Sequence, residues 1–157
     1  MADIVDRETR SRMMRGIRGA NTKPEMNVRR RLHAAGFRYG LHRKDLPGRP
    51  DLVMPRHDAV VFVHGCYWHR HTGCRLATTP STRTDFWMTK FAANQERDLR
   101  NISDLRDWGW RVAVVWECKV RTNSGADSAA SALIEWLLSN EQFIEIPAKP
   151  ELTPSVV

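Results

Sequence analysis

The chain has 157 residues and a mass of 18.1 kDa, which suits one compact domain and is too short for two ordinary domains. Its longest apolar run, residues 59–63, is far shorter than a membrane span, and the N-terminus does not read as a secretory signal. We therefore expect a soluble, cytoplasmic protein. The 25 basic and 18 acidic side chains give a net charge of +7. We interpret this charge as a sign of a DNA or RNA partner; the alternative is that it serves only solubility.

The positive charge is concentrated before residue 120 and is carried mainly by arginine. Residues 1–119 hold 23 basic and 13 acidic side chains, whereas residues 120–157 hold two and five, and the chain has 20 arginines against five lysines. The planar guanidinium of arginine forks onto phosphate and guanine. We expect residues 1–20 to contact DNA, through a short basic helix over residues 6–18 that places three arginines on the DNA backbone: Arg12, Arg15 and Arg18.

A second helix is predicted to begin at Thr22 and to end at Gly36. Thr22 and Glu25 form a capping box, and Pro24 lies in the first turn, where its missing N–H costs nothing. Residues 46–50 follow, and their two prolines and one glycine predict a loop.

Three apolar segments are predicted to form the centre of a sheet. Residues 51–54 and 59–63 read as strands joined by a tight turn, and residues 110–116 read as another strand. The segment 59–63 is apolar throughout and 110–116 is nearly so, which indicates strands covered on both faces.

The remaining segments are predicted to surround this sheet. Residues 64–84 are irregular and polar, and residues 126–138 form a last helix. Residues 85–108 show apolar side chains at helical spacing, Leu99 among them, which predicts a long helix with one apolar face. Residues 141–157 are expected to be a flexible tail, because three prolines fall in a short segment. The order of elements predicts a single α/β domain with a mixed central sheet flanked by helices.

The three cysteines and one histidine can form a closed metal site. Cys66, His71 and Cys74 lie in the irregular segment, and Cys118 follows the strand that can lie beside residues 59–63. Three thiolates and one imidazole make a tetrahedral set typical of structural zinc. The alternative is a scatter of inert buried thiols with a solvent-facing histidine; an odd cysteine count argues against a disulfide framework.

A second site is expected around Asp51, which opens a strand next to the end of residues 59–63. An aspartate in this position binds Mg²⁺ beside the scissile phosphate in restriction-type nucleases. The second carboxylate and the lysine usual on the next strand are absent, since Phe62, Val63 and His64 stand there. In isolation, the Pro-Asp pair more often merely begins a strand.

Crowded histidines favour catalysis at that site. His64, His69 and His71 share a short segment, and zinc needs only one of them. A histidine can act as general base when a carboxylate orients it, and Asp98 on the long predicted helix is a candidate for that carboxylate. Alternatively, His64 and His69 lie on the surface or support the zinc site. The alternative for Asp98 is an ion pair with a neighbouring arginine on the helix.

A series of motifs resembles the very short patch repair (Vsr) DNA mismatch endonucleases, and the resemblance covers about residues 6–121. In chain order the motifs are Gly48-Arg-Pro-Asp51, Phe62-Val-His-Gly-Cys66-Tyr-Trp-His69, Thr82-Arg-Thr-Asp-Phe-Trp87, Glu96-Arg-Asp98, Gly109-Trp-Arg-Val and Val115-Trp-Glu-Cys118. The resemblance implies a restriction-endonuclease-like fold with a structural zinc. It also implies Mg²⁺-dependent nicking 5′ of the thymine in T:G mismatches that arise when 5-methylcytosine deaminates.

The resemblance also implies a role for particular residues. Asp51 would bind Mg²⁺ together with the backbone carbonyl of Val63, and His69 would be the catalytic histidine with Asp98 beside it. His64 and Glu25 would complete the catalytic site. Zinc would be held by Cys66, His71, Cys74 and Cys118, and the DNA would be entered beside the mismatch by three aromatic side chains: Tyr67, Trp68 and Trp87.

Two residues depart from the family pattern. Val63 stands where threonine is expected, which matters little if only the carbonyl binds metal, and Tyr67 stands where phenylalanine is expected. The wedge has a physical rationale, because unstacking a base step costs least at a mispair. The alternative is that the three aromatic residues belong to the core.

The expected partner is double-stranded DNA with a T:G mismatch, acted on by a monomer in the bacterial cytoplasm and nucleoid. Mismatch-repair proteins and a repair polymerase are further partners that the resemblance implies, and no membrane is expected. Two other functions compete: a noncatalytic zinc-containing DNA-binding module, and a restriction-type nuclease that cuts matched DNA. A binding module would not require Asp51, His69 and Asp98.

Overall fold

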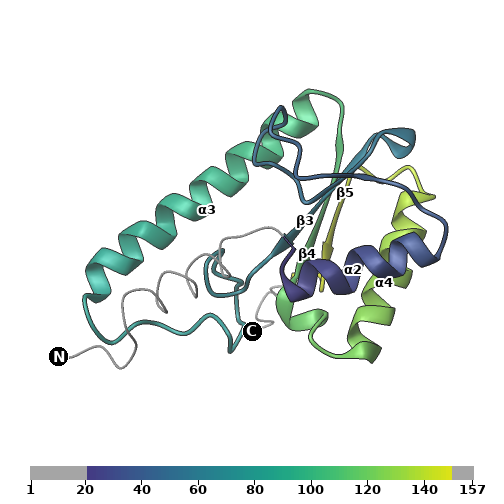
Figure 1. Cartoon of the computed structure of the whole chain (residues 1–157). Helices are drawn as coiled ribbons and strands as arrows, with labels where there is room; N and C mark the ends of the chain where they lie inside the picture. Colours follow the sequence, from purple (N-terminus) through teal and green to yellow (C-terminus); the bar gives the residue numbers. More distant parts are fainter. Residues whose placement is uncertain (1–20, 150–157) are drawn as a thin grey trace, which may run out of the picture.

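The computed structural model of the chain describes residues 21–149, which form a mixed five-stranded sheet between two layers of helix (Figure 1). The strands lie in the order of the sequence. β2 is antiparallel to both of its neighbours, β1 and β3, and β4 and β5 run parallel to β3. The fold class predicted from the sequence is therefore confirmed. The strands are β1 (Gly40–Leu41), β2 (Leu52–Met54), β3 (Ala59–His64), β4 (Arg111–Trp116) and β5 (Phe143–Ile146).

The helix α2 (Lys23–Ala34) begins where the capping box predicted it. The Thr22 hydroxyl accepts a hydrogen bond from the backbone N–H of Glu25 at 3.4 Å, and Gly36 follows the helix at a φ of +97°. Val28 and Leu32 are buried and hold the helix against the sheet. The cap therefore fixes the first turn of α2, the turn that carries Glu25.

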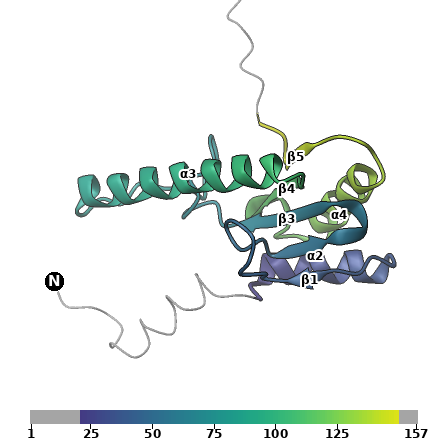
Figure 2. The same ribbon diagram turned by 90° about the horizontal axis from the view of Figure 1, so that it is seen from above.

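The two other helices cover opposite faces of the sheet. α4 (Asn123–Leu137) lies beside α2 on one face, whereas α3 (Thr84–Asp107) lies on the other face and extends beyond the strands at its N-terminal end (Figures 1 and 2). α4 begins three residues earlier than predicted, because the Thr122 hydroxyl accepts from Gly125 N–H at 3.0 Å and caps the helix. Among residues 21–149, no helix is long and apolar enough to cross a membrane.

The strands β3 and β4 form the buried centre of the sheet. Each residue of β4 is buried, and five of the six residues of β3 are buried. Their parallel register pairs Ala59 with Arg111 at one end and His64 with Trp116 at the other. As predicted, the chain thus leaves both strands at the same end of the sheet.

The structure differs from the sequence-based expectation in three places. Residues 143–146 form β5, although a flexible tail was expected over 141–157; the prolines that suggested a tail all follow this segment, and its mostly apolar Phe-Ile-Glu-Ile run pairs with β4. The strand β1 was not predicted, because two residues show no periodicity. Leu99 was expected on the apolar face of the long helix but is 67% exposed. The predicted helix over 6–18, with Arg12, Arg15 and Arg18, lies outside the described residues.

Candidate active site and metal centre

A cleft of ≈ 950 Å³ opens between the end of β3, the N-terminus of α2 and one side of α3. Two clusters of titratable side chains line it, one around Asp51 and one around His69, and the cysteine cluster lies just behind the second. Four exposed basic side chains also line the cleft: Lys23, Arg49, Lys90 and Arg97. The cleft is therefore acidic and histidine-rich inside and basic at its exposed margin.

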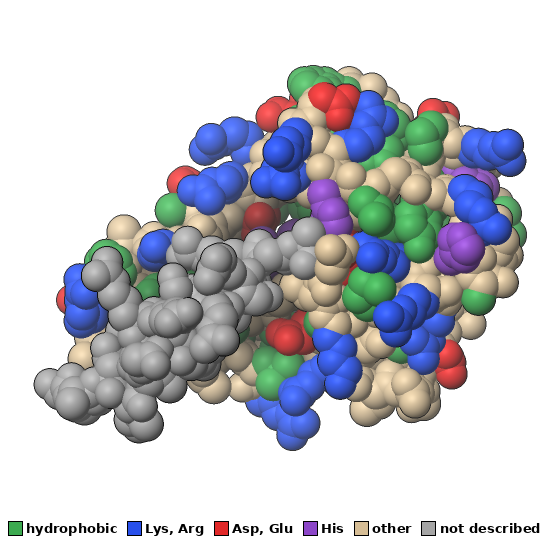
Figure 3. Space-filling model, viewed as in Figure 1, with side chains coloured by type: hydrophobic (Ala, Val, Ile, Leu, Met, Phe, Trp, Pro, Cys, Tyr) green, Lys and Arg blue, Asp and Glu red, His purple; other side chains and the backbone are tan. Residues whose placement is uncertain are grey.

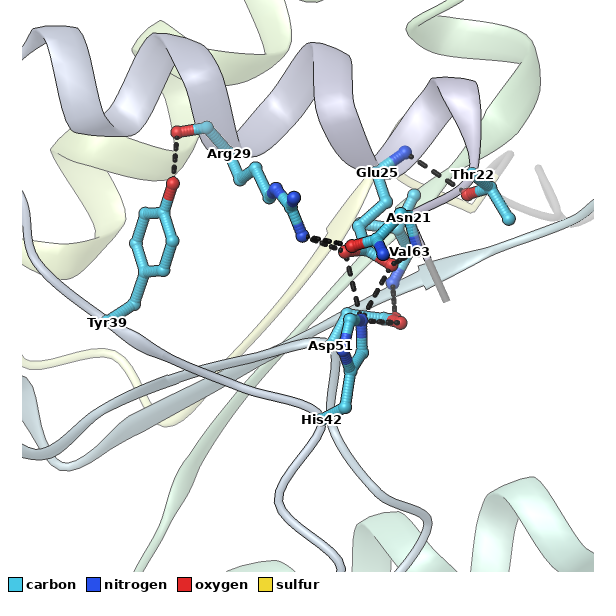
Figure 4. Close-up of polar contacts among 8 residues, drawn as sticks. All are labelled: Asn21, Thr22, Glu25, Arg29, Tyr39, His42, Asp51 and Val63. Atoms are coloured by element: carbon cyan, nitrogen blue, oxygen red, sulfur yellow. Dashed lines mark hydrogen bonds and ion pairs between the residues drawn. The ribbon is translucent and has the colours of Figure 1, made fainter. Parts of the chain in front are cut away.

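Asp51 lies at the start of β2, next to the end of β3. Its Oδ2 accepts a hydrogen bond from the backbone N–H of Val63 at 2.7 Å (Figure 4). The sequence therefore predicted this neighbourhood correctly. The carbonyl of Val63 was expected to ligate metal with Asp51, and that ligation stays a prediction.

The carboxyl group of Asp51 is held in an environment that disfavours its charge. Burial above all, and the nearby Glu25 carboxylate, raise the pKa of Asp51 from 3.8 to about 7, although the Val63 N–H and His42 oppose the rise. A divalent cation would relieve both causes at once, because it supplies the positive charge that the site lacks. One ligand atom from each of Glu25, His42 and Asp51 lies within 4.8 Å of the others.

Glu25 reaches this site from the first turn of α2. Its side chain is 1% exposed and accepts hydrogen bonds from the guanidinium of Arg29 at 2.8 Å and from the backbone N–H of Asn21 at 3.2 Å. The Nε2 atom of His42 lies 2.9 Å from both carboxylate oxygens (Figure 4). Glu25 was expected here from the family resemblance, whereas His42, which follows the short unpredicted strand β1, was not predicted.

The second cluster joins His69 to Asp98. The Nδ1 atom of His69 lies 2.6 Å from Oδ2 of Asp98, a carboxylate presented by α3. The ring of His64 stacks on that of His69, with centroids 3.9 Å apart and planes 4° from parallel. Burial, and the neighbouring His69, hold the pKa of His64 well below its usual value. The structure therefore brings together the three residues that the sequence grouped.

The four predicted zinc ligands also converge. One ligand atom from each of Cys66, His71, Cys74 and Cys118 lies within 4.8 Å of the others. Nδ1 of His71 is 3.6 Å from the sulfur of Cys66 and 3.5 Å from that of Cys118. A tetrahedral zinc with bonds of about 2.3 Å to sulfur and about 2.0 Å to nitrogen separates such atoms by about 3.5 Å.

The chemistry of this cluster favours a bound cation. Burial raises the pKa of the Cys66 and Cys118 thiols, and other thiols of the cluster raise both further. Thiolates in this position therefore need a positive charge between them. Glu117, which the sequence analysis also missed, accepts a hydrogen bond from the Cys66 N–H at 3.1 Å and so fixes the chain beside the cluster.

The three predicted wedge residues form one aromatic cluster with Phe91. Tyr67 and Trp68 come from the irregular segment and Trp87 comes from α3; their ring centroids lie 5.2, 6.2 and 6.1 Å from that of Phe91. All three are partly exposed, whereas Phe91 is 1% exposed. Phe86, which was not predicted, adds an exposed ring 5.3 Å from Trp87. The cluster is therefore neither wholly core nor wholly surface.

The raised pKa of Asp51 generates a prediction about folding that needs no metal. Because the pKa of Asp51 is raised in the folded chain, the protonated carboxyl group contributes to stability and the ionised one does not. This contribution is fully present below the unfolded pKa of 3.8 and is lost as pH rises through about 7. The Asp51→Asn variant has no group that can ionise at this position, so it does not lose this stability as pH rises. In the absence of divalent cations, the stability advantage of Asp51→Asn over wild type is expected to grow by about 2–3 kcal/mol between pH 5 and pH 8.

Chemical unfolding of both chains at each pH measures this difference. Asp107→Asn, on the exposed end of α3, is the matched control and should show no growing advantage. A constant difference between Asp51→Asn and wild type across this range would contradict the inferred environment of Asp51.

Comparisons with known proteins match the sequence of this chain to one family. The family model described as DNA mismatch endonuclease Vsr matches residues 2–75. The type II nicking enzyme V.XorIIP of Xanthomonas oryzae is 50% identical over 76% of this chain and 88% of its own length. The DNA mismatch endonuclease Vsr of Escherichia coli is 42% identical over 87% of this chain and 88% of its own length.

A third relative, the type II nicking enzyme V.NmeAIP of Neisseria meningitidis, is 41% identical over 79% of this chain and 88% of its own length. All three matches extend over most of the chain, so they include strands and helices beyond the N-terminal half. The chain therefore belongs to the Vsr family of DNA mismatch endonucleases, as its motifs predicted, and is a DNA endonuclease.

Proposed function

We propose that this endonuclease nicks DNA on the 5′ side of the thymine in a T:G mismatch, in a reaction that depends on Mg²⁺. The observation that carries the proposal is the single cleft in which the Asp51–Val63 contact faces the hydrogen-bonded pair of His69 and Asp98. A nuclease needs a carboxylate to hold a cation and a base to activate water, and this cleft offers both.

Asp51 would hold the cation through its second oxygen, because Val63 N–H already occupies Oδ2. The carbonyl of Val63 is the proposed second protein ligand, and a valine serves there as well as a threonine. When bound, Mg²⁺ would polarise the scissile phosphate and stabilise its developing charge. The remaining chemistry falls to side chains of the chain itself.

His69 is the proposed general base. Donation of Nδ1–H to Asp98 leaves Nε2 free to accept a proton from the attacking water, and the carboxylate stabilises the imidazolium that results. The stacked His64 restricts rotation of the His69 ring. Asp98 therefore supports His69 rather than acting on the substrate.

The Cys66–His71–Cys74–Cys118 cluster is proposed to hold a structural zinc. Four protein ligands leave no position for water or substrate, so this metal would stabilise the fold without taking part in hydrolysis. The segment of residues 64–84 is long and irregular, and a metal would clamp it to the end of β4.

DNA would approach the cleft along its basic margin. Figure 3 shows many Lys and Arg side chains on the face of the molecule that it displays. The cleft itself is lined by the four basic side chains named above. They would neutralise phosphates without reading sequence. The exposed edges of Tyr67, Trp68 and Trp87 would stack between bases, where a mispair unstacks most easily.

The competing functions fit less well. The family places the chain among endonucleases, which disfavours a noncatalytic DNA-binding module. Relatives are named nicking enzymes, which disfavours cleavage of both strands of matched DNA. We further propose that the chain acts as a monomer and that mismatch-repair proteins and a repair polymerase complete the repair.

The first prediction of this function concerns the chemistry of nicking. With Mg²⁺, the chain should nick a T:G heteroduplex and leave the matched C:G parent intact. Asp51→Asn should abolish nicking while mismatch binding persists, because an amide cannot supply the carboxylate charge. His69→Ala should slow the single-turnover rate about 10²–10⁴-fold. Asp98→Asn should slow it less and add little to His69→Ala, since both act through one imidazole.

Gel analysis of an end-labelled heteroduplex measures these rates, with Asp107→Asn as the control for loss of a carboxylate on α3. Equal nicking of both duplexes would remove the T:G assignment. Near-normal nicking by His69→Ala would place the base elsewhere, with His64 as the next residue to test.

The second prediction concerns the wedge. Trp68→Ala should weaken binding to T:G DNA by about 1–3 kcal/mol, the usual worth of stacking, and should change binding to matched DNA little. Fluorescence anisotropy with both duplexes separates the two effects. Trp108→Ala is the matched control, because that indole is 61% exposed at the far end of α3. Equal losses on both duplexes would make Trp68 a packing residue.

The third prediction concerns zinc. The purified chain should contain one tightly held zinc, and Cys118→Ser should lose it and unfold at a lower temperature, since the metal clamp would be broken. Elemental analysis and thermal unfolding measure the two effects. A metal-free chain that is as stable as the purified one would exclude the proposed structural role.

A further inference from the structure

His42 holds a position in the cleft that the proposed chemistry does not use. It follows β1 in the left-handed conformation, at a φ of +48°, which few residues other than glycine adopt. Its backbone N–H donates to the carbonyl of Asp51 at 3.3 Å, which ties this turn to β2. The unusual backbone geometry places the imidazole between the Glu25 and Asp51 side chains (Figure 4).

The imidazole makes its contacts through one nitrogen. Nε2 lies 2.9 Å from both oxygens of Glu25 and 3.9 Å from Oδ1 of Asp51. Ionised carboxylates only accept hydrogen bonds, so Nε2 must carry the proton and donate it. The surroundings thus select one tautomer of His42.

This donor completes the set of contacts around Glu25. Arg29 and the Asn21 N–H approach the same carboxylate from α2 and its N-terminus, and His42 approaches from the sheet. The three donors together fix both the position and the rotation of a side chain that is 1% exposed. Without His42, the contacts to Glu25 from α2 and its N-terminus would remain, and the side nearest Asp51 would lose its donor.

We propose that His42 is a positioning residue of the nicking site, which holds the Glu25 carboxylate beside Asp51 so that a divalent cation meets a preorganised pair. This inference rests on the proposed function only where it names T:G nicking as the reaction. The effect of His42 on cation affinity can be measured without that reaction. Arg29 already brings one permanent charge to Glu25, and an imidazole suits the side nearest Asp51 since it can donate a hydrogen bond without adding a second. Residues that orient a metal ligand typically contribute 10–100-fold to metal affinity.

Cation affinity of the DNA-free protein tests the proposal directly. His42→Ala should weaken Mn²⁺ binding in calorimetric titration about tenfold or more. His42→Gln should recover most of that loss, because its amide N–H can donate to Glu25 from a similar reach. His33→Ala is the matched control, since that histidine is exposed on α2 and should leave Mn²⁺ affinity unchanged.

The nicking reaction supplies the second readout. His42→Ala should raise the Mg²⁺ concentration for half-maximal nicking of T:G DNA about tenfold, while the rate at saturating Mg²⁺ stays within a few-fold of wild type. Thermal unfolding of the zinc-loaded variants verifies that each is folded, and ¹⁵N-imidazole NMR of wild type should show the Nε2–H tautomer at His42.

Three results would overturn the role of His42: wild-type Mn²⁺ affinity in a folded His42→Ala, no recovery in a folded His42→Gln, or a proton on Nδ1 alone. Failure of the proposed function gives a different pattern. Wild type would then leave T:G DNA uncut, while the Mn²⁺ titrations of the DNA-free chain would still decide whether His42 positions Glu25.

Discussion

The parallel pairing of β3 with β4 is the constraint on which both candidate sites depend. The register places His64 opposite Trp116, so the chain leaves the two strands at one end of the sheet. From that end, Cys66 and Cys118 are each only two residues beyond a paired position. The antiparallel hairpin of β2 and β3 then sets Asp51 against Val63, one residue before the same end. A shift of one residue would turn these side chains to the opposite face.

Ring stacking joins the cysteine cluster to the histidine pair through one indole. Trp116 stacks on His71 with centroids 4.3 Å apart, and its edge meets His64 at 5.3 Å. Its Nε1–H donates to Glu145 of β5 at 2.8 Å, which fixes the plane of the indole. His64 in turn stacks on His69. The strand β5 therefore supports the cleft from the far edge of the sheet, although the sequence suggested only a tail there.

Sequence reasoning succeeded where one local pattern was sufficient. The capping box predicted the start of α2, and the apolar runs predicted β2, β3 and β4. The neighbourhood of Asp51 and Val63 followed from a hairpin, which is a short-range contact. The closure of the cysteine cluster needed only the placement of β4 beside β3.

The contacts that sequence reasoning missed depend on packing between distant segments. His42 follows a two-residue strand and contacts Glu25, which lies 17 positions earlier in the chain. No hydrophobic periodicity in the sequence predicts such a contact. Glu25 itself was named through family resemblance, because a glutamate at the third position of a capping box ordinarily needs no other role. Burial of Asp51 beside a second carboxylate also arises only when α2 docks on the sheet.

The charges in the cleft lower the stability of the folded chain in a way that would favour the binding of a cation. Burying Asp51 next to Glu25 raises the pKa of Asp51 and so destabilises the folded chain at neutral pH. Arg29 and His42 contact Glu25 closely and offset part of its charge, whereas the Asp51 carboxylate accepts from the neutral N–H of Val63 and has the His42 imidazole only at 3.9 Å. The proposed cation would complete the neutralisation of the Asp51 carboxylate. Because a cation bound at Asp51 as proposed would remove this destabilisation, part of the folding free energy lost at Asp51 would reappear as affinity for the metal.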